Sequence, residues 1–415
     1  MLLHMVGRKN AAGLVGAGVN AAAQFLLVVV VTRTLDTAAA GTFFTITAAM
    51  VMLAGVLRLD AGNGLIYFRA RTTRVPKFRD MEVRGQPATA SPSRPLLWVA
   101  LAPVVLGSVA AGAGLASGSA MILPAALVLP FVVVADVLVS ATRGRGSMRP
   151  TLLLDGLLQP IGQLVLVTVA VLAGAPFPVI LLAWALPAIP VTLLAARQLA
   201  RRPYGSVTWP EFWRYTAPRS VAAAIQAVFQ RLDIVLVALL AGPAQAAIYT
   251  AATRFRVVGQ LVSQGLAQAV QPRLVRAMAD GDPAEAWRAY RRATRTLIVL
   301  TWPLWVGYAA FAPWILQLFG PGYPQAADIA LVLSITMLVA TGCGLVDVVL
   351  IAAGRTTTSL VNTAAAVGTT VLLDLLLVPG LGALGAALGW SGGVLVKNLL
   401  PLAQITRSYA PRVAA

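Results

Sequence analysis

The sequence is poor in the residues on which most catalysis depends. It contains one histidine, His4, and one cysteine, Cys343, in 415 residues, and its only lysines are Lys9, Lys77 and Lys397. These scarcities exclude histidine-dependent catalytic triads, the usual zinc clusters and a disulfide framework. The chain also has no GxxxxGK[ST] phosphate-binding loop, which excludes ATP hydrolysis by that route. We therefore predict a protein that is not an enzyme and that holds no cofactor and no metal ion.

Charged residues of any kind are also scarce. They make up 11% of the chain and hydrophobic residues 59%, whereas soluble domains carry roughly 25% charge. Each bilayer crossing takes about 20 apolar residues, so with connections the chain holds about twelve spans. The predicted fold class is therefore an all-α polytopic membrane protein with about twelve transmembrane helices and no separate soluble domain.

Hydrophobic runs place these spans along the whole chain. The predicted spans are 11–31, 38–58, 95–116, 121–141, 151–172, 179–196, 219–240, 246–270, 296–316, 326–350, 358–378 and 382–405. A shift of 206 positions aligns Ala40–Thr45 with Ala246–Ala251 and Gln24 with Gln230. Because six spans per repeat is an even number, two such repeats run in the same direction. We predict two six-helix lobes, 1–200 and 201–415, related by pseudo-twofold symmetry; chance similarity between apolar helices is the alternative.

The excess of basic residues predicts the orientation of the chain. Lys and Arg number 32 against 14 Asp and Glu, a formal net charge of +18. With the N-terminus inside, 26 of the 32 fall in cytoplasmic segments and only Arg33 falls in an outer loop. Cationic residues are retained on the cytoplasmic side during insertion. The charge therefore indicates membrane topology, with both termini cytoplasmic, and nucleic acid is not an expected partner.

Polar residues inside the spans predict the functional site, because charge at mid-bilayer costs at least ~2.5–3.5 kcal/mol per residue on insertion scales. Several of them recur at three- and four-residue steps on one helix face. The candidate residues that line a substrate-binding cavity are Asn20, Gln24, Arg58, Asp60, Gln226, Gln230, Arg231, Asp233, Arg254, Arg256, Gln260 and Gln264. The functional interpretation is a water-filled, net-positive cavity between the halves that suits an anionic headgroup. The alternative is that Arg and Asp pair across helix interfaces and Gln residues join helices by hydrogen bonds.

Two further patterns have a structural and a functional interpretation. Asp136, Asp347 and Asp374 are carboxylates in apolar surroundings that could relay protons or bind a coupling cation, or simply pair helices. Gly380–Gly385 matches the GxGxxG dinucleotide pattern, but it follows a membrane helix rather than a strand. We interpret it as a hairpin turn, followed by the small-residue pair Gly385 and Gly389 that allows close helix packing.

Several stretches, in order, resemble the polysaccharide transporter (Wzx-like oligosaccharide flippase) branch of the multidrug/oligosaccharidyl-lipid/polysaccharide (MOP) exporter superfamily. The stretches that carry the resemblance are Asn20–Phe44, Gln230–Asp233, Ala247–Tyr249, Ala251–Arg254, Phe319–Tyr323, Gly354–Arg355, Asn362, Leu377–Gly382 and Gly385–Ala387. The resemblance implies two lobes around a cavity that opens alternately to each side of the membrane. Lipid II flippase relatives carry an arginine in the first span and two further C-terminal helices. The span 11–31 has no charge here and the sequence ends after the twelfth span, so we do not expect transport of peptidoglycan precursors.

The resemblance also implies a function. We expect a flippase that moves an undecaprenyl-pyrophosphate-linked oligosaccharide across a bacterial inner membrane by alternating access, for cell-surface polysaccharide biosynthesis. The expected partners are the lipid-linked glycan and membrane lipids, with the polysaccharide polymerase and glycosyltransferases as further candidates. The alternative is a cation-coupled exporter of drugs or metabolites with the same fold, which a net-basic cavity disfavours.

Overall fold

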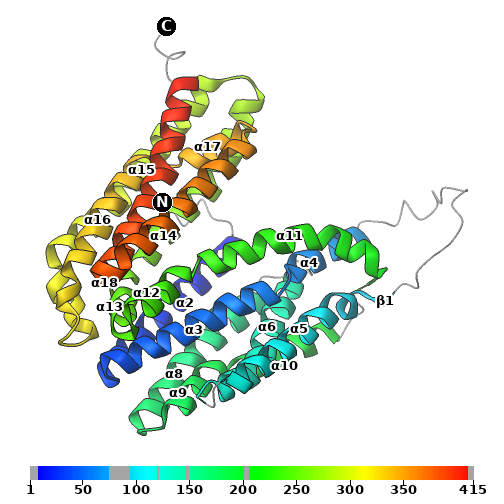
Figure 1. Cartoon of the computed structure of the whole chain (residues 1–415). Coiled ribbons are helices and arrows are strands. Elements are labelled where there is room, and N and C mark those ends of the chain that lie inside the picture. Colours follow the sequence, from blue (N-terminus) through cyan, green and yellow to red (C-terminus); the bar gives the residue numbers. More distant parts are fainter. Residues whose placement is uncertain (1–7, 74–93, 119–120, 145–148, 201–204, 410–415) are drawn as a thin grey trace, which may run out of the picture. The chain divides into compact units, whose positions relative to one another are not determined.

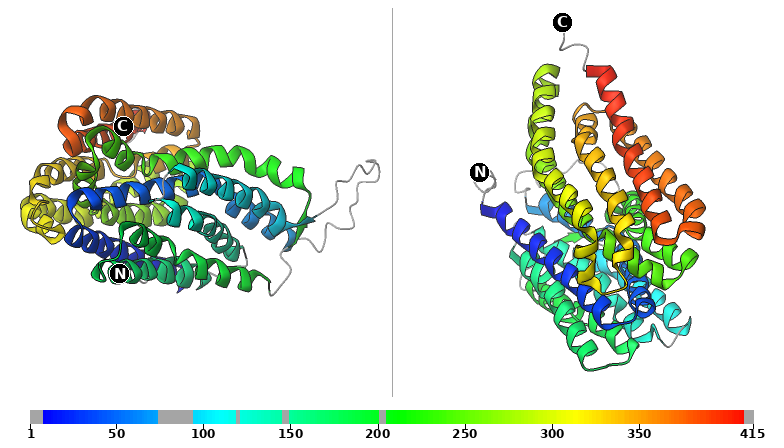
Figure 2. Two further views of the ribbon diagram at one scale, coloured as in Figure 1. Left: turned by 60° about the horizontal axis from the view of Figure 1, so that its bottom comes forward. Right: turned by 90° about the vertical axis from the view of Figure 1, so that its left-hand side faces the viewer.

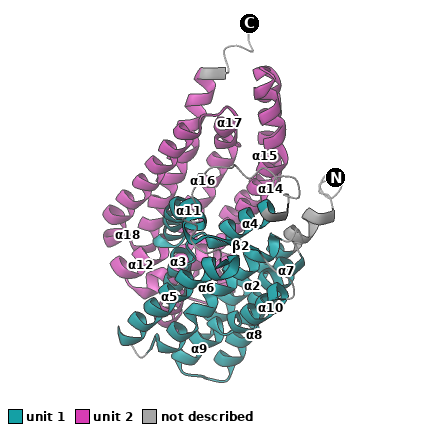
Figure 3. Ribbon diagram, turned by 90° about the vertical axis from the view of Figure 1, so that its right-hand side faces the viewer, with its two compact units in different colours: residues 1–34, 46–232 teal, residues 35–45, 233–415 magenta. Residues whose placement is uncertain are grey.

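The computed structural model describes residues 8–73, 94–118, 121–144, 149–200 and 205–409 (Figure 1). Nearly all of these residues are helical, and the one sheet among them is the pairing of β1 (Arg94–Pro95) with β2 (Ser206–Val207). The chain divides into two compact units, residues 1–34 with 46–232 and residues 35–45 with 233–415 (Figure 3). The all-helical, two-lobed fold class is confirmed.

The first unit is built around α6, which packs against α4, α5, α9 and α10. Its centre is apolar, and side chains such as Leu96, Leu129 and Val191 are completely buried. Its elements are α2 (Arg8–Thr34), most of α3 (Thr37–Leu57), α4 (Ala61–Thr73), α5 (Leu96–Gly118), α6 (Leu123–Arg143), α7 (Arg149–Thr151), the π-helix η1 (Leu152–Leu158), α8 (Gln159–Leu172), α9 (Phe177–Ala185), α10 (Ala188–Ala200) and α11 (Trp209–Phe229).

The second unit contains the longest helices of the chain. Here α15 packs against α14 and α16, and α18 packs against α13, α16 and α17. Its elements are the first turns of α3, then α12 (Leu232–Ala241), α13 (Pro243–Thr253), α14 (Arg256–Ala279), α15 (Pro283–Leu316), η2 (Gln317–Phe319), η3 (Pro324–Ala326), α16 (Ala327–Gly342), α17 (Val346–Ala352) and α18 (Thr356–Tyr409).

Each of the twelve predicted spans coincides with a helix or with two consecutive helices. By length and composition alone, the described residues contain nine helices that can cross a membrane, or ten spans if one bent pair of helices counts as one. The count of ten is lower than twelve for two reasons. Two predicted spans are joined in the single helix α18, and α14 has too many glutamines and arginines to pass as apolar.

The hairpin predicted at Gly380–Gly385 is present within α18. Gly382 has φ 57° and ψ −131°, and there the helix turns back on itself. In Figure 2 the two halves of α18, orange and red, lie side by side. A Cβ atom at Gly385 would stand 2.5 Å from the backbone of Leu377, and one at Gly389 would stand 2.0 Å from the Asp374 carboxylate. The small-residue spacing therefore permits the close packing that it predicted.

The unit boundary at 232 differs from the predicted lobe boundary at 200, because α11 is attached to the first unit. The Trp213 indole donates a hydrogen bond to the Val99 carbonyl (3.2 Å), and the Tyr67 and Tyr215 rings stack at 4.1 Å between centroids. The pairing of β1 with β2 adds a further link between the same segments. The pseudo-twofold relation between the lobes stays a prediction.

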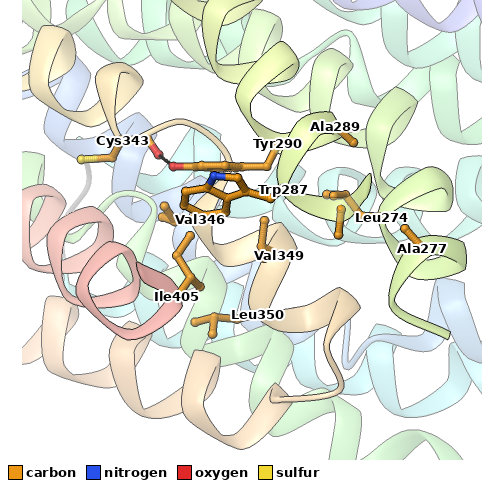
Figure 4. Packing of buried hydrophobic residues seen from close by; sticks show 11 residues of the cluster. Leu274, Ala277, Trp287, Ala289, Tyr290, Cys343, Val346, Val349, Leu350 and Ile405 are labelled. Carbon is orange, nitrogen blue, oxygen red and sulfur yellow. Dashed lines mark hydrogen bonds between the residues drawn. The ribbon is translucent and has the colours of Figure 1, made fainter. Parts of the chain in front are cut away.

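A buried cluster fills the end of the second unit where α14, α15, α17 and the end of α18 meet (Figure 4). The helix α15 begins here, capped by Asp282, whose side chain accepts a hydrogen bond from the Glu285 N–H (2.8 Å), a standard way to satisfy a free backbone donor. The Tyr290 hydroxyl donates to the Cys343 carbonyl, and the Trp287 and Tyr290 rings pack at 5.1 Å. These contacts hold α15 against the turn between α16 and α17.

Alanine at Gly344, in that turn, is expected to destabilise the second unit by about 3 kcal/mol, since it combines backbone strain with overpacking. Gly344 has φ +71°, and a Cβ atom there would stand 2.0 Å from the Thr294 hydroxyl. Gly354 is the matched control, because it has φ +75° but open space around its Cβ position. Gly354→Ala should cost only the backbone term, about 1 kcal/mol. Thermal unfolding in detergent measures both variants, and equal losses would contradict the steric argument.

Candidate functional site

Five side chains from four helices form a charged cluster inside the second unit, which we call the Asp233–Arg256 cluster. Asp233 lies in the first turn of α12, Tyr249 on α13 and Arg256 at the start of α14. Asp374 and Trp390 come from the two halves of α18. The helix is interrupted at residues 230–231 and again at 254–255, which places the first turns of α12 and α14 here.

Asp233 is the centre of the cluster. Its Oδ2 accepts a hydrogen bond from the Tyr249 hydroxyl (2.8 Å) and an ion-paired one from Arg256 Nη2 (3.2 Å). Its Oδ1 accepts the N–H of Ile234 (2.9 Å). The Asp233 and Arg256 side chains are only 10% and 16% exposed. Breaking a buried pair of this kind leaves an uncompensated charge, which typically costs about 3–5 kcal/mol.

Aromatic rings hold the Arg256 guanidinium on its other sides. Its central carbon lies 4.5 Å from the centroid of the Trp390 ring and 5.9 Å from that of Tyr249. Tyr249 is completely buried, and its hydroxyl oxygen accepts a long hydrogen bond from Arg256 Nη1 (3.4 Å). Cation–π contacts strengthen when the partners are desolvated. Arg256 therefore joins α12, α13, α14 and α18 through one side chain.

Asp374 is the least satisfied member of the cluster. It is 1% exposed, and its Oδ1 has no hydrogen-bond partner within the described part of the chain. It is close enough to Asp233 for the two carboxylates to interact electrostatically. The absence of a side chain at Gly389 makes room for its Oδ1. The cluster thus contains two carboxylates and one guanidinium, an excess of acid when both carboxylates are ionised.

The first unit has a second group of charges around the π-helix η1 (Leu152–Leu158). Arg58 pairs with Asp136 at 2.9 Å, and Arg143 with Asp155, which lies within η1, at 3.7 Å. All four side chains are 37–54% exposed. Ion pairs this exposed contribute little to stability. The π-helical turn beside them is nevertheless of interest, because such turns are frequent at functional sites.

Asp60 stabilises the turn between α3 and α4. It is 7% exposed and accepts hydrogen bonds from Arg219 (2.9 Å), on α11, and from the Asn63 amide (2.6 Å). The Ser220 hydroxyl donates to the Leu59 carbonyl in the same place. Leu59 and Asp60 have φ of +50° and +46°, an unfavourable backbone for residues other than glycine. The Arg219 contact therefore holds a strained turn.

The amide side chains among the predicted residues fall into two groups. Gln24 donates a hydrogen bond to the Gln163 side chain at 2.9 Å and so joins α2 to α8. The others are exposed, on α2, α11, the residue after α11, and α14: Asn20, Gln226, Gln230, Gln260 and Gln264. Gln260 and Gln264 follow Arg256 at four-residue steps along α14, so they share one side of that helix.

The twelve predicted residues are thus distributed over both units. Asn20, Gln24, Arg58, Asp60, Gln226, Gln230 and Arg231 belong to the first unit, and Asp233, Arg254, Arg256, Gln260 and Gln264 to the second. Arg58, Asp60, Asp233 and Arg256 are ion-paired, as the alternative interpretation expects, while Arg231 and Arg254 are half-buried. The cavity between the halves stays a prediction.

Sequence reasoning missed Tyr249, Trp390 and Arg219, three residues that contact the predicted ones. Tyr249 is part of a stretch used for the family resemblance, and Trp390 is an aromatic residue beside the glycine-rich run of α18. Neither fact indicated a partner. Arg219 stands at the start of the predicted span 219–240, and nothing in the sequence paired it with Asp60, 159 positions away.

Comparison with known protein families finds one match. The MatE family model matches residues 218–376, which is less than half of the chain. No curated protein matches. The matched region begins in α11 and contains Asp233, Tyr249, Arg256 and Asp374.

Solved structures match over nearly the whole chain. An inward-facing MATE multidrug transporter of the MOP superfamily has a TM-score of 0.72 at 15% identity and covers 94% of this chain and 95% of its own. The lipid II flippase MurJ, in an inward closed conformation, has the same TM-score at 12% identity, with coverages of 98% and 90%. This chain has the MOP transporter fold. A MOP superfamily transporter from Pyrococcus furiosus also matches, with a TM-score of 0.60, 16% identity and coverages of 98% and 95%.

Proposed function

We propose that this protein is a flippase that carries an undecaprenyl-pyrophosphate-linked oligosaccharide across a bacterial inner membrane by alternating access, for cell-surface polysaccharide biosynthesis. The observation that carries the proposal is the polarity of α14. This helix is not among the nine described helices that are apolar enough to cross a membrane, although it continues the span that α13 begins. A helix with so many polar side chains requires water or a polar cargo beside it.

The exposed side of α14 fits a glycan. Gln260 and Gln264 are exposed, and each amide offers both donors and an acceptor. A sugar hydroxyl both donates and accepts hydrogen bonds, so it can use the donors and the acceptor of an amide. A lipid-linked cargo also needs a fold that admits a polar headgroup while its lipid tail stays in the bilayer. The match to the lipid II flippase MurJ, at the same TM-score as the match to the MATE transporter, supports such a cargo.

The pyrophosphate of the cargo needs cations at membrane depth. Arg58 and Arg254 are the candidates, together with Arg231, since arginine pairs bidentately with phosphate oxygens. Arg58 keeps 39% of its side chain exposed while paired with Asp136, so a phosphate can compete for it. Arg256 is committed to Asp233 and Trp390, and we assign it the role of holding the helices that carry the binding residues.

A second candidate function is cation-coupled export of drugs or metabolites. The match of the MatE family model to residues 218–376 favours it, as does the excess of carboxylates in the Asp233–Arg256 cluster. Under either function we propose cytoplasmic termini, as the arginine distribution predicts. Glycosyltransferases and the polymerase are proposed partners only under the glycan function.

Transport by the purified protein in liposomes separates the two functions. We expect a fluorescent undecaprenyl-pyrophosphate oligosaccharide to change leaflets at least tenfold faster than in protein-free liposomes, with no gradient-driven movement of ethidium. The control is the same lipid without its sugar, which tests whether the glycan is recognised. Ethidium transport without flipping would establish the exporter in place of the flippase.

A further inference from the structure

Four arginines lie on the outer side of the first turns of α15, opposite its buried side. Ala286, Ala289, Tyr290, Ala293 and Leu297 are buried in this part of the helix. The exposed arginines, at three- and four-residue steps, are Arg288, Arg291, Arg292 and Arg295. Residues at these spacings share one side of a helix. The cluster of Figure 4, with Trp287 and Tyr290, fixes this helix from behind.

The arginine row continues directly into an apolar surface. Beyond Arg295 the same steps lead to Val299, Trp302 and Val306, whose exposed fractions are 70%, 40% and 54%. Large apolar side chains this exposed, on a membrane helix, face lipid tails. The change from arginine to valine between Arg295 and Val299 therefore marks the edge of the hydrocarbon region on this side of α15.

The length of α15 agrees with that placement. Trp314, 63% exposed, lies 19 residues beyond Arg295. At about 1.5 Å per residue this separation is roughly 28 Å, close to the ~30 Å thickness of the hydrocarbon core. Tryptophan is enriched at membrane interfaces. Arg291, Arg292 and Arg295 therefore lie at the depth of the lipid headgroups, on the side that the charge distribution predicts to be cytoplasmic.

Carboxylates neutralise only part of this arginine row. Arg288 pairs with Glu285 (3.2 Å) and Asp282 (3.9 Å). Arg291 lies over the Trp287 ring at 5.4 Å, which orients it without neutralising it. Arg292 and Arg295 make no ion pair with any residue in the described ranges. Among the described residues, these three cations are thus left without a counter-charge at headgroup depth.

We infer that Arg291, Arg292 and Arg295 form a binding surface for the phosphate groups of anionic phospholipids in the cytoplasmic leaflet. The charge is complementary, the depth matches, and the surface is continuous with the lipid-facing side of the same helix. An acidic soluble protein fits less well, since the headgroups occupy this depth. The inference does not depend on which cargo the protein carries.

Binding of phosphatidylglycerol to the detergent-purified full chain tests the inference, with phosphatidylcholine as the neutral comparison. Each arginine near a membrane surface contributes roughly fivefold in affinity, so the triple variant R291Q/R292Q/R295Q should bind phosphatidylglycerol on the order of a hundredfold more weakly. Phosphatidylcholine binding should not change. The single variants R292Q and R295Q, each expected to lose roughly fivefold, keep the test decisive if the triple variant misfolds.

A matched control removes the same charge elsewhere. Arg149, Arg197 and Arg214 are exposed arginines of the first unit. The variant R149Q/R197Q/R214Q should retain phosphatidylglycerol binding within about twofold, because these three arginines lie on three different helices and form no row for one headgroup cluster. Equal losses in both triple variants would overturn the inference in favour of unspecific attraction. Unchanged phosphatidylglycerol binding in R291Q/R292Q/R295Q would overturn it as well, even if the variant no longer bound an acidic protein.

Discussion

Replacement of Arg256 by alanine is expected to reduce translocation on the order of a hundredfold or more, as truncating one partner of a buried, hydrogen-bonded charge pair does. The guanidinium joins Asp233, Tyr249 and Trp390, from three helices other than its own. Its loss leaves Asp233 buried without a cation, so the variant should also unfold more easily, by about 3–5 kcal/mol. Translocation in liposomes and thermal unfolding measure the two effects.

A second variant separates function from stability. In D233N/R256Q both charges are removed together, so no buried charge is left unpaired and most of the stability should return. Translocation should stay low, because the cation that joins the helices is still absent. R256K keeps the charge but lacks the planar group that stacks on Trp390. Its translocation rate should therefore lie between those of the unaltered protein and D233N/R256Q. Full translocation by D233N/R256Q would contradict the role of Arg256 in holding the helices together. Arg273, exposed and paired with Glu285, supplies the control R273Q.

Replacement of Asp374 by asparagine is expected to uncouple transport from its driving ion. We propose that Asp374 takes up a proton or a cation during the cycle, since it is buried and its Oδ1 has no partner among the described residues. Coupling free energies of about 1–3 kcal/mol correspond to a 5- to 150-fold effect, so the acceleration of transport by an imposed gradient should fall by that factor. Transport without a gradient should persist.

The control for this variant is another carboxylate of the same unit. Asp347 accepts a hydrogen bond from the Ser359 hydroxyl, so it is already satisfied by the protein. D347N should leave the gradient response unchanged within about twofold. Transport is measured with a proton gradient, a sodium gradient and neither. A gradient response that survives intact in D374N would exclude Asp374 as the coupling residue.

Local chemistry made much of the fold predictable. The apolar runs gave the positions of the spans, because lipid offers no hydrogen-bond partner and only a helix or a closed barrel satisfies its own backbone polar groups there. The turn at Gly382 was predictable from its glycines, since a φ of 57° costs glycine little. The close approach at Gly385 and Gly389 followed from the small-residue spacing. The row of Gln260 and Gln264 followed from helical periodicity.

The partners of the charged residues were not predictable in the same way. Arg256 could have paired with any nearby carboxylate or faced the cargo. The sequence around Asp60 did not predict that Arg219 is its partner. These contacts join residues 23 and 159 positions apart. The attachment of α11 to the first unit likewise depends on contacts such as Trp213 with Val99, 114 positions apart, which shifted the unit boundary to 232.

The sequence by itself determined that this is a many-spanning helical protein, where its helices begin and turn, and which side chains are too polar for lipid. Hydrophobicity and backbone conformation decide these properties over a few neighbouring residues. Only the tertiary structure decided that Arg256 is held between Asp233 and Trp390, and that Asp374 has one oxygen with no partner in the described ranges. An ion pair depends on the distance between two atoms, and packing alone sets that distance when the residues lie on different helices.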